Sequence, residues 1–212
     1  MDLKNLRREY SLGKLSEEEV DKDPVKQFAN WFMAAKDSEM QDPNAFCLST
    51  ADLQGQPSLR TVLLKYFDEE GFVFFTNLGS RKANEIKNNP QTAMLFPWLI
   101  LQRQVIIMGK AKKISVLEAT KYFASRPRGS QIGAWVSDQS KVVNNRQILQ
   151  NKFKQLAQKF TGKDIPMPKM WGGFRIVPHR FEFWQGGENR IHDRIEYLYN
   201  EEKNWVINRL MP

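Results

Sequence analysis

Residues 45–76 read AFCLSTADLQGQPSLRTVLLKYFDEEGFVFFT, and this stretch decides the fold class of the chain. Three apolar and β-branched runs, at 45–50, 58–65 and 72–76, are separated by the turn-forming segments QGQP and DEEG. Short runs of this composition joined by close turns are typical of consecutive antiparallel strands. The stretch therefore predicts an antiparallel sheet.

Further runs of the same kind extend this sheet on both sides of a helical middle section. We expect additional strands at residues 92–98, 103–114, 171–177, 180–185, 194–199 and 205–210. Apolar spacing predicts helices from Pro24 onward and at residues 80–89, 116–125, 129–137 and 144–160. About eight short strands that do not alternate regularly with helices indicate an α+β chain, mainly β, built on one antiparallel β-barrel. Neither a G-x-G-x-x-G turn nor a P-loop is present.

The length and composition fit one soluble globular domain. The chain has 212 residues, of which 41% are hydrophobic and 26% charged. We expect residues 1–23, which are polar and charge-dense, to form a mobile N-terminal arm, and residues 24–212 to form a single domain. No apolar run approaches the roughly 18 residues that span a membrane, and no signal peptide is recognisable. We therefore expect a cytoplasmic protein that does not enter the membrane.

Cysteine and histidine usage narrows the possible chemistry. The one cysteine, Cys47, cannot form an intrachain disulfide, and its apolar surroundings predict a small buried core residue. Two histidines in all make a histidine-rich metal site untenable, so we expect no metal. Difficult chemistry would then depend on an organic cofactor.

The formal net charge of +8 could indicate nucleic-acid or acidic-membrane binding. However, lysines and arginines are interleaved with acids and form no run of five or more. A small phosphorylated ligand would account for part of the surplus equally well.

The densest set of functional side chains is WQGGENRIHDR, residues 184–194. If Arg190, His192 and Arg194 lie on an extended segment, alternation places all three on one face and makes a cationic pocket floor. The alternative is a solvated edge hairpin whose charges serve solubility.

Two segments could hold phosphate. In FFTNLGSRK, Thr76, Ser80, Arg81 and Lys82 lie where a strand runs into a helix N-terminus, and the free N–H groups, the helix dipole and two cations favour an anion. Alternatively, the two cations are ordinary surface residues.

The second segment is residues 121–140. Tyr122 and Arg126 stand one helical turn apart, Ser130 follows on a Pro/Gly turn, and Gln139 and Ser140 are neutral donors nearby. Taken singly, each is more often a turn or surface residue.

Three more residues, Arg60, Lys65 and Gln104, could contact the same ligands or a second one. Arg60 and Lys65 are five apart, so a regular strand would point them to opposite faces, unless a bulge intervenes, and they could serve different ligands. Gln104 can hydrogen-bond a planar heterocycle, on which Trp184 could stack. A pocket for two phosphates and one heterocycle uses most of the cations.

Six motifs occur in order along the chain: RREY (7–10), RTVLLK (60–65), FFTNLGSRK (74–82), RQV (103–105), YFASRPRGSQIGAWVSDQS (122–140) and FWQGGENRIHDR (183–194). With these motifs the chain resembles the pyridoxine/pyridoxamine 5′-phosphate oxidase family over essentially its whole length. The last two motifs are long and specific.

The resemblance implies an FMN-binding split β-barrel, antiparallel and Greek-key-like with peripheral helices, that forms a homodimer with FMN at the subunit interface. The flavin contacts that it implies are Arg60, Thr61, Val62, Leu63, Leu64, Lys65, Phe75, Thr76, Arg81, Lys82, Gln104, Gln139, Ser140, Trp184 and Arg194. The substrate contacts that it implies are Arg7, Arg8, Glu9, Tyr10, Lys65, Tyr122, Arg126, Ser130, Arg190, Ile191 and His192. Arg190 and His192 would be catalytic, and the segment from Arg7 to Tyr10 would close on bound substrate.

The reaction implied by the resemblance converts pyridoxamine 5′-phosphate and pyridoxine 5′-phosphate to pyridoxal 5′-phosphate. A hydride equivalent leaves the C4′ carbon for the flavin, and O₂ accepts the electrons and becomes hydrogen peroxide. Ile106 and Met108 depart from the family pattern, because many relatives have R-V-E-G where this chain has IIMG. The departure removes a charge pair that could matter for strand packing or for the dimer surface.

Other functions remain as alternatives. Another split-barrel flavoprotein, such as an FMN reductase or a deazaflavin-dependent enzyme, would need the flavin set without Tyr122, Arg126, Ser130, Arg190 and His192 together. A non-catalytic module could carry FMN or pyridoxal phosphate. Nucleic-acid binding rests on charge alone, and seven cations assigned to phosphorylated ligands nearly match the excess of eight, so we expect no nucleic-acid partner.

Overall fold

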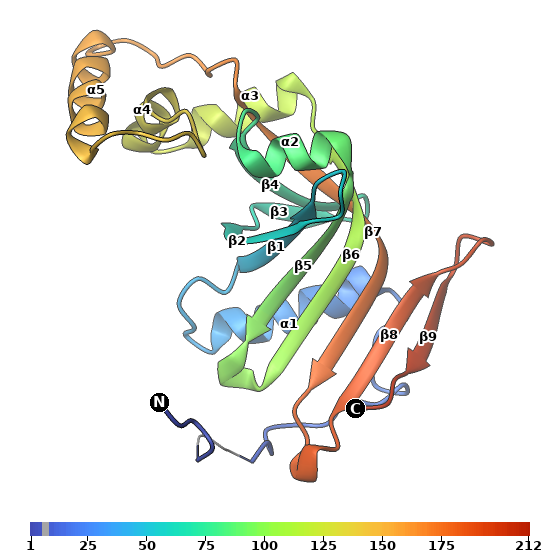
Figure 1. Ribbon diagram of the computed structural model, residues 1–212. Helices are drawn as coiled ribbons and strands as arrows, with labels where there is room; N and C mark the ends of the chain where they lie inside the picture. The colour runs from blue at the N-terminus through green and yellow to red at the C-terminus, as the bar shows by residue number, and fades with distance from the viewer. Residues whose placement is uncertain (6–8) are drawn as a thin grey trace.

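The computed structural model describes residues 1–5 and 9–212. Within this part of the chain, nine strands form one curled antiparallel sheet with five α-helices around it (Figure 1). The strands are β1 Ala45–Ala51, β2 Pro57–Leu63, β3 Tyr66–Asp68, β4 Gly71–Asn77, β5 Gln91–Trp98, β6 Arg103–Lys113, β7 Trp171–Gln185, β8 Asp193–Tyr199 and β9 Trp205–Arg209. The helices are α1 Pro24–Asp37, α2 Arg81–Asn88, α3 Val116–Ser125, α4 Arg128–Val136 and α5 Arg146–Lys159, with short 3₁₀ turns at Leu99–Leu101 and Glu188–Arg190. The predicted α+β, mainly antiparallel fold is confirmed.

The sheet runs in the order β2-β1-β5-β6-β7-β4-β3, and β8 and β9 continue from β7. The first part of β7, from Trp171 to Ile176, pairs with β4, whereas Arg180 to Gln185 pairs with β8. One long strand thus belongs to both ends of the sheet. This division of β7 fixes where the functional residues lie.

Two details of the sheet differ from the sequence-based expectation. The runs at 171–177 and 180–185 are one strand, because the register shift opposite Met108 and Gly109 leaves only His179 of the paired stretch of β7 without a partner on β6, while Pro178 still pairs with Gly109. Gly109 permits the close approach there, since a Cβ would lie 2.4 Å from the Val177 carbonyl oxygen. The three-residue β3 was not predicted, because a strand that short gives no alternation to detect.

The main core lies between the sheet and α1, whose buried side chains share one cluster with those of the strands. Asp23 caps α1 by accepting a hydrogen bond from the Val25 N–H, and Pro24 occupies the first turn. Phe28 is fully buried, and its ring lies within 6.0 Å of five aromatic rings, Phe32, Phe67, Phe72, Phe96 and Trp98. Cys47, in contrast, is only half-buried, since on β1 the residues that alternate into the core are its neighbours Phe46 and Leu48. The expectation of a buried cysteine is therefore wrong.

A second, smaller core attaches α3 and α4 to the sheet. Val73, Phe123, Ile132, Phe160 and Trp171 are buried together in it. This core places two helices with predicted site residues against the β4 and β7 end of the barrel (Figure 1).

The segment before α1 contains no helix or strand among its described residues, but its second half is attached to the domain. Leu15 and Val20 are buried in the main core. The Leu15 N–H donates to Asp193, and the Tyr197 hydroxyl donates to the Asp21 carbonyl. Mobility of this arm stays a prediction. None of the helices described is long and apolar enough to cross a membrane.

Candidate active site

One cavity of about 730 Å³ collects most of the predicted residues at the end of the barrel beside α2, α3 and α4. Its volume is typical of small-molecule sites. The predicted residues that line it are Arg60, Thr61, Val62, Leu63, Lys65, Phe75, Thr76, Lys82, Tyr122, Arg126, Ser130 and Gln139. We call this set the first group.

The α2 N-terminus forms one wall of the cavity. Lys82 is buried, and its Nζ donates to Thr76 Oγ1 at 3.1 Å and to Gln139 Oε1 at 2.7 Å. The Arg81 N–H donates to Ser140 Oγ at 3.2 Å. Burial, with the nearby charge of Arg60, lowers the pKa of Lys82 to about 8, although Glu85 opposes the shift. This wall joins an ammonium, a helix N-terminus and neutral donors, which suits a phosphate.

Arg60 and Lys65 line the same cavity, so the expectation that they point to opposite faces is wrong. The physical reason is that β2 ends at Leu63 and strand alternation stops before Lys65. Burial lowers the pKa of Lys65, and the positive charge of Arg126 lowers it further. Lys65 and Arg126 are thus two cations that line the same cavity and repel one another. An anion placed there would relieve their repulsion.

The opposite wall comes from α3 and α4. Arg126 is the C-terminal cap of α3, one turn after Tyr122, and Ser130 lies in the first turn of α4. The Pro/Gly turn predicted at Ser130 is therefore a helix start. Arg126 Nη1 is buried and has no hydrogen-bond partner among the described residues. A buried guanidinium nitrogen without an acceptor is costly, which favours an anionic ligand at this point.

An aromatic stack supports this wall. The ring of Phe75 lies 4.0 Å from that of Tyr122 and 5.0 Å from that of Trp171, nearly parallel to both. The Arg126 guanidinium lies 5.0 Å above Trp171. Trp171 lines the cavity, yet sequence reasoning missed it, because it heads a strand beside two glycines and resembles an ordinary core residue.

Three predicted residues of this end, Leu64, Arg81 and Ser140, do not line the cavity. The Leu64 side chain is buried in the main core, and its N–H and carbonyl both bond to Asn44. The Arg81 side chain is largely exposed and donates from Nε to Glu85 at 2.9 Å.

A second group of predicted residues lies on β6, β7 and β8. Gln104 pairs in register with Trp184, and Trp184 pairs with Arg194, so three strands bring these side chains side by side. The Tyr10 ring meets Trp184 edge-on at 5.8 Å and His192 at 5.5 Å. The Gly187 N–H donates to His192 Nδ1 at 3.1 Å. These residues form an aromatic and cationic surface.

Arg190 does not lie on an extended segment. It ends a 3₁₀ turn and has φ +64°, and β8 begins only at Asp193. The predicted alternation of Arg190, His192 and Arg194 on one strand face is therefore wrong. Arg190 and Ile191 are exposed at the tip of the β7–β8 connection. A non-glycine residue held at positive φ is uncommon and occurs often at functional sites.

Arg194 belongs to an ion-pair ladder on β7 and β8. Its Nη2 and Nε lie 2.8 and 2.9 Å from Glu182 Oε1, and Arg180 pairs with Glu196 at 2.7 Å. In register, Ile106 stands beside Glu182, and Met108 stands beside Arg180. The departures from the family pattern thus leave β6 without charges here, and Glu182 and Arg180 take their partners from β8.

The two groups lie at opposite ends of β7. Trp171, which lines the cavity of the first group, and Trp184 of the second group are thirteen residues apart on this strand, up to about 40 Å at roughly 3.3 Å per residue. In Figure 1, β7 runs from the side of α3 to the opposite edge of the sheet. One copy of the chain therefore does not bring the two groups to the same ligand.

The predicted arm residues divide between described and undescribed parts. Arg7 and Arg8 lie outside the described residues. Glu9 is exposed, and Tyr10 joins the second group as stated above.

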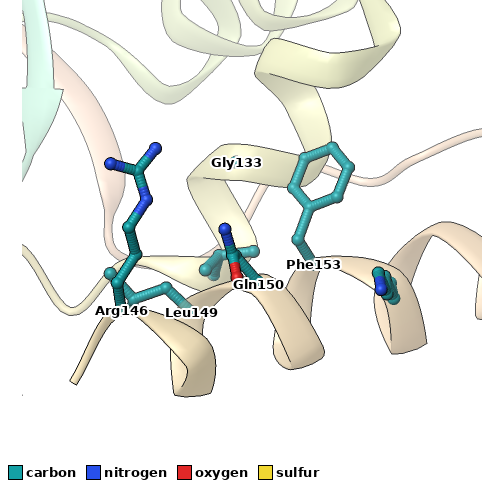
Figure 2. A pocket seen from close by; sticks show the side chains of 7 residues that line it. Gly133, Arg146, Leu149, Gln150 and Phe153 are labelled. Atoms are coloured by element: carbon teal, nitrogen blue, oxygen red, sulfur yellow. The ribbon is translucent and has the colours of Figure 1, made fainter. Parts of the chain in front are cut away.

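A separate hollow of about 680 Å³ lies between α4 and α5 (Figure 2). Leu149 and Phe153 supply its apolar surface, and Arg146 lies at one side. None of the residues predicted for the site lines it.

Comparison with known proteins gives consistent similarities. Residues 32–160 match the family model described as pyridoxamine 5′-phosphate oxidase, and residues 171–212 match the pyridoxine 5′-phosphate oxidase C-terminal dimerisation region. The pyridoxine/pyridoxamine 5′-phosphate oxidase of Rippkaea orientalis is 56% identical over 212 residues, and the match covers the full length of both proteins. The protein of the same name from Klebsiella pneumoniae is 52% identical over 98% of this chain and 95% of its own.

Solved structures agree in fold. PhzG from Burkholderia lata 383, in complex with tetrahydrophenazine-1-carboxylic acid, has a TM-score of 0.88 at 26% identity and covers 93% of this chain and 98% of its own. An FMN-binding protein related to pyridoxamine 5′-phosphate oxidase, from Nostoc punctiforme, has a TM-score of 0.71 at 14% identity, covers 91% of this chain and 100% of its own, and shares the fold.

Proposed function

Because this chain belongs to the pyridoxamine 5′-phosphate oxidase family, we propose that its two groups of residues meet across a homodimer to oxidise a phosphorylated pyridine on FMN. The function is the oxidation of pyridoxine and pyridoxamine 5′-phosphates, as the names of the relatives that it matches at 52–56% identity over essentially full length support. The alternatives of a reductase, a non-catalytic module and a nucleic-acid-binding protein are not retained.

The observation that carries the proposal is the separation of the two groups along β7. Each group is a partial site. The first group has cations for phosphate but lacks the tryptophan and glutamine that could bind a heterocycle, and the second group has Trp184 and Gln104 but lacks the phosphate-binding residues of the first. A two-fold dimer would place the second group of one copy over the first group of its partner, twice. The family's C-terminal dimerisation region, residues 171–212, contains most of the second group.

The FMN phosphate would bind at the α2 N-terminus. Lys82, Thr76 and Gln139 already share hydrogen bonds there, and Ser140 Oγ accepts from the Arg81 N–H. A phosphate oxygen could replace the amide oxygen of Gln139 as acceptor for Lys82. The residues fit the group, because a buried ammonium at a helix N-terminus, whose Nζ donates to the neutral acceptors Thr76 and Gln139, favours an anion.

The phosphate of the substrate would bind at the opposite wall. Arg126 offers its unpaired Nη1, Lys65 offers an ammonium, and Tyr122 and Ser130 offer hydroxyls. These four anchors on one end of the substrate would fix the position of the carbon to be oxidised, which lowers the entropy cost of reaction.

The redox chemistry would be supplied by bound FMN, as the acceptor of the hydride equivalent from the substrate and the source of the two electrons that reduce O₂ to hydrogen peroxide. The chain itself orients and polarises the substrate. Because His192 Nδ1 accepts the Gly187 N–H, the neutral ring carries its proton on Nε2 and can donate it in a hydrogen bond to a substituent of the pyridine ring. Arg190 supplies a positive charge beside it.

Anaerobic absorbance spectroscopy tests this function. The purified protein, loaded with FMN, should lose its flavin band when pyridoxamine 5′-phosphate is added without oxygen. Readmitted air should restore the band and release hydrogen peroxide. A flavin band that persists with both the amine and the alcohol substrate would refute the proposed reaction.

A further inference from the structure

Glu85, on α2, is a buried carboxylate that none of the motifs marks. Its side chain is 7% exposed. Four donors converge on it: Thr50 and Ser58 hydroxyls at 2.5 Å each, Arg81 Nε at 2.9 Å, and Arg60 Nη2 at 3.4 Å. Although burial raises the pKa of Glu85, the hydrogen bonds from Ser58, Thr50 and Arg81 lower it to about 2. Glu85 is therefore ionised at every physiological pH.

The same cluster engages the terminal nitrogens of Arg60. These two nitrogens carry four hydrogens. Nη1 donates to the Leu48 carbonyl at 3.3 Å and to Thr50 Oγ1 at 2.5 Å, and Nη2 donates to Ser58 Oγ and Glu85. Each hydrogen has an acceptor inside the protein. A phosphate that used Arg60 fully would have to compete with these acceptors.

Charge explains why a carboxylate is useful at this place. Arg60, Arg81 and Lys82 are three cations next to one another, and the charge of Arg60 already disfavours the protonated form of Lys82. One carboxylate among three cations leaves a net charge of +2. That charge equals in magnitude the charge of a phosphomonoester dianion.

We propose that Glu85 is a built-in counter-ion of the phosphate site, which offsets one of the positive charges of Arg60, Arg81 and Lys82 in the absence of flavin and lowers the affinity for FMN when flavin arrives. This inference rests on the proposed binding of FMN phosphate at α2. Both anions relieve the same repulsion among the three cations, so each makes the other less favourable. Glu85 thus stabilises the empty site and makes FMN easier to release.

The test replaces Glu85 by glutamine, which keeps the size of the side chain and one acceptor oxygen. We expect Glu85→Gln to lower the FMN dissociation constant about fivefold or more, measured by quenching of flavin fluorescence. The melting temperature of the flavin-free variant should fall by about 2–4 °C or more. Binding of riboflavin, which has no phosphate, should not change.

Glu70→Gln is the matched control. It changes the net charge by the same amount, but Glu70 is 81% exposed beside Arg175 and does not line the cavity. We expect wild-type FMN affinity for this variant. An equal gain in FMN affinity from Glu70→Gln would overturn the assignment, because the effect would then be one of overall charge.

The remaining outcomes are also decisive. Weaker or unchanged FMN binding by Glu85→Gln, with normal binding by wild type, overturns the counter-ion and leaves the proposed function intact. A wild-type protein that binds no FMN overturns both. A Glu85→Gln protein that folds only when FMN is present supports the inference, whereas one that folds under neither condition shows a purely structural carboxylate.

Discussion

Two inactive variants should restore one another if each active site takes one group of residues from each subunit. Arg126→Met removes a buried guanidinium from the first group of residues, and Arg190→Met removes an exposed guanidinium from the second group. In a mixed dimer, one site carries both defects and the other carries neither. Random exchange makes about half of the dimers mixed, and each has one intact site, so the mixture should recover about one quarter of wild-type activity.

The assay is peroxide release from pyridoxamine 5′-phosphate after the two variants are refolded together. Different affinity tags on the variants allow the mixed dimer to be isolated, and that species should show about half of wild-type activity. FMN content serves as the control, because neither substitution touches the α2 phosphate site. An isolated mixed dimer that holds FMN but is no more active than its parents would refute the arrangement of the two groups.

Three further changes have definite expected results. Phe28→Ala should cost about 3–5 kcal/mol of unfolding free energy in a denaturant titration, because it empties the centre of five aromatic contacts, whereas Met33→Ala on the exposed side of α1 should cost little. FMN affinity should fall as the pH rises through about 8, where Lys82 loses its proton, and Lys82→Arg should abolish that fall; an unchanged titration would exclude Lys82 from the phosphate site. Tyr66→Phe should raise KM for the phosphorylated substrate with kcat nearly unchanged, because the Tyr66 hydroxyl bonds to Glu118 on α3 and so positions Tyr122; a loss in kcat alone would contradict this.

Local patterns predicted the elements well, and their failures have specific causes. The helix at 116–125 has the predicted bounds, because a serine cap begins it and a proline follows its end. The two runs that merge into β7 looked separate because a proline such as Pro178 normally interrupts pairing, and the bulge at His179 that lets β7 continue leaves no local signal. Arg190 was misplaced because strand alternation was extended across a turn with positive φ.

The sequence predicted which residues belong to the site, but it did not predict that they form two separate groups in one copy of the chain. Motif spacing identified Arg60, Tyr122 and Arg194 without showing that β7 separates the first two from the third. Glu85 was missed for another reason: on a helix, a glutamate four residues after an arginine looks like a surface ion pair. Its burial depends on Thr50 and Ser58, which lie on β1 and β2, far from Glu85 in the sequence.

The attachment of the segment before α1 also constrains how the protein is made. Arg209, on the last strand, donates to the Leu15 carbonyl and pairs with Glu17, across a sequence separation of more than 190 residues. A ribosome that synthesises the chain from its N-terminus exposes Leu15 and Val20 long before β8 and β9 exist to receive them. These two apolar side chains therefore stay unburied until translation is nearly complete. We expect chaperones that bind exposed apolar segments to recognise this region of the nascent chain.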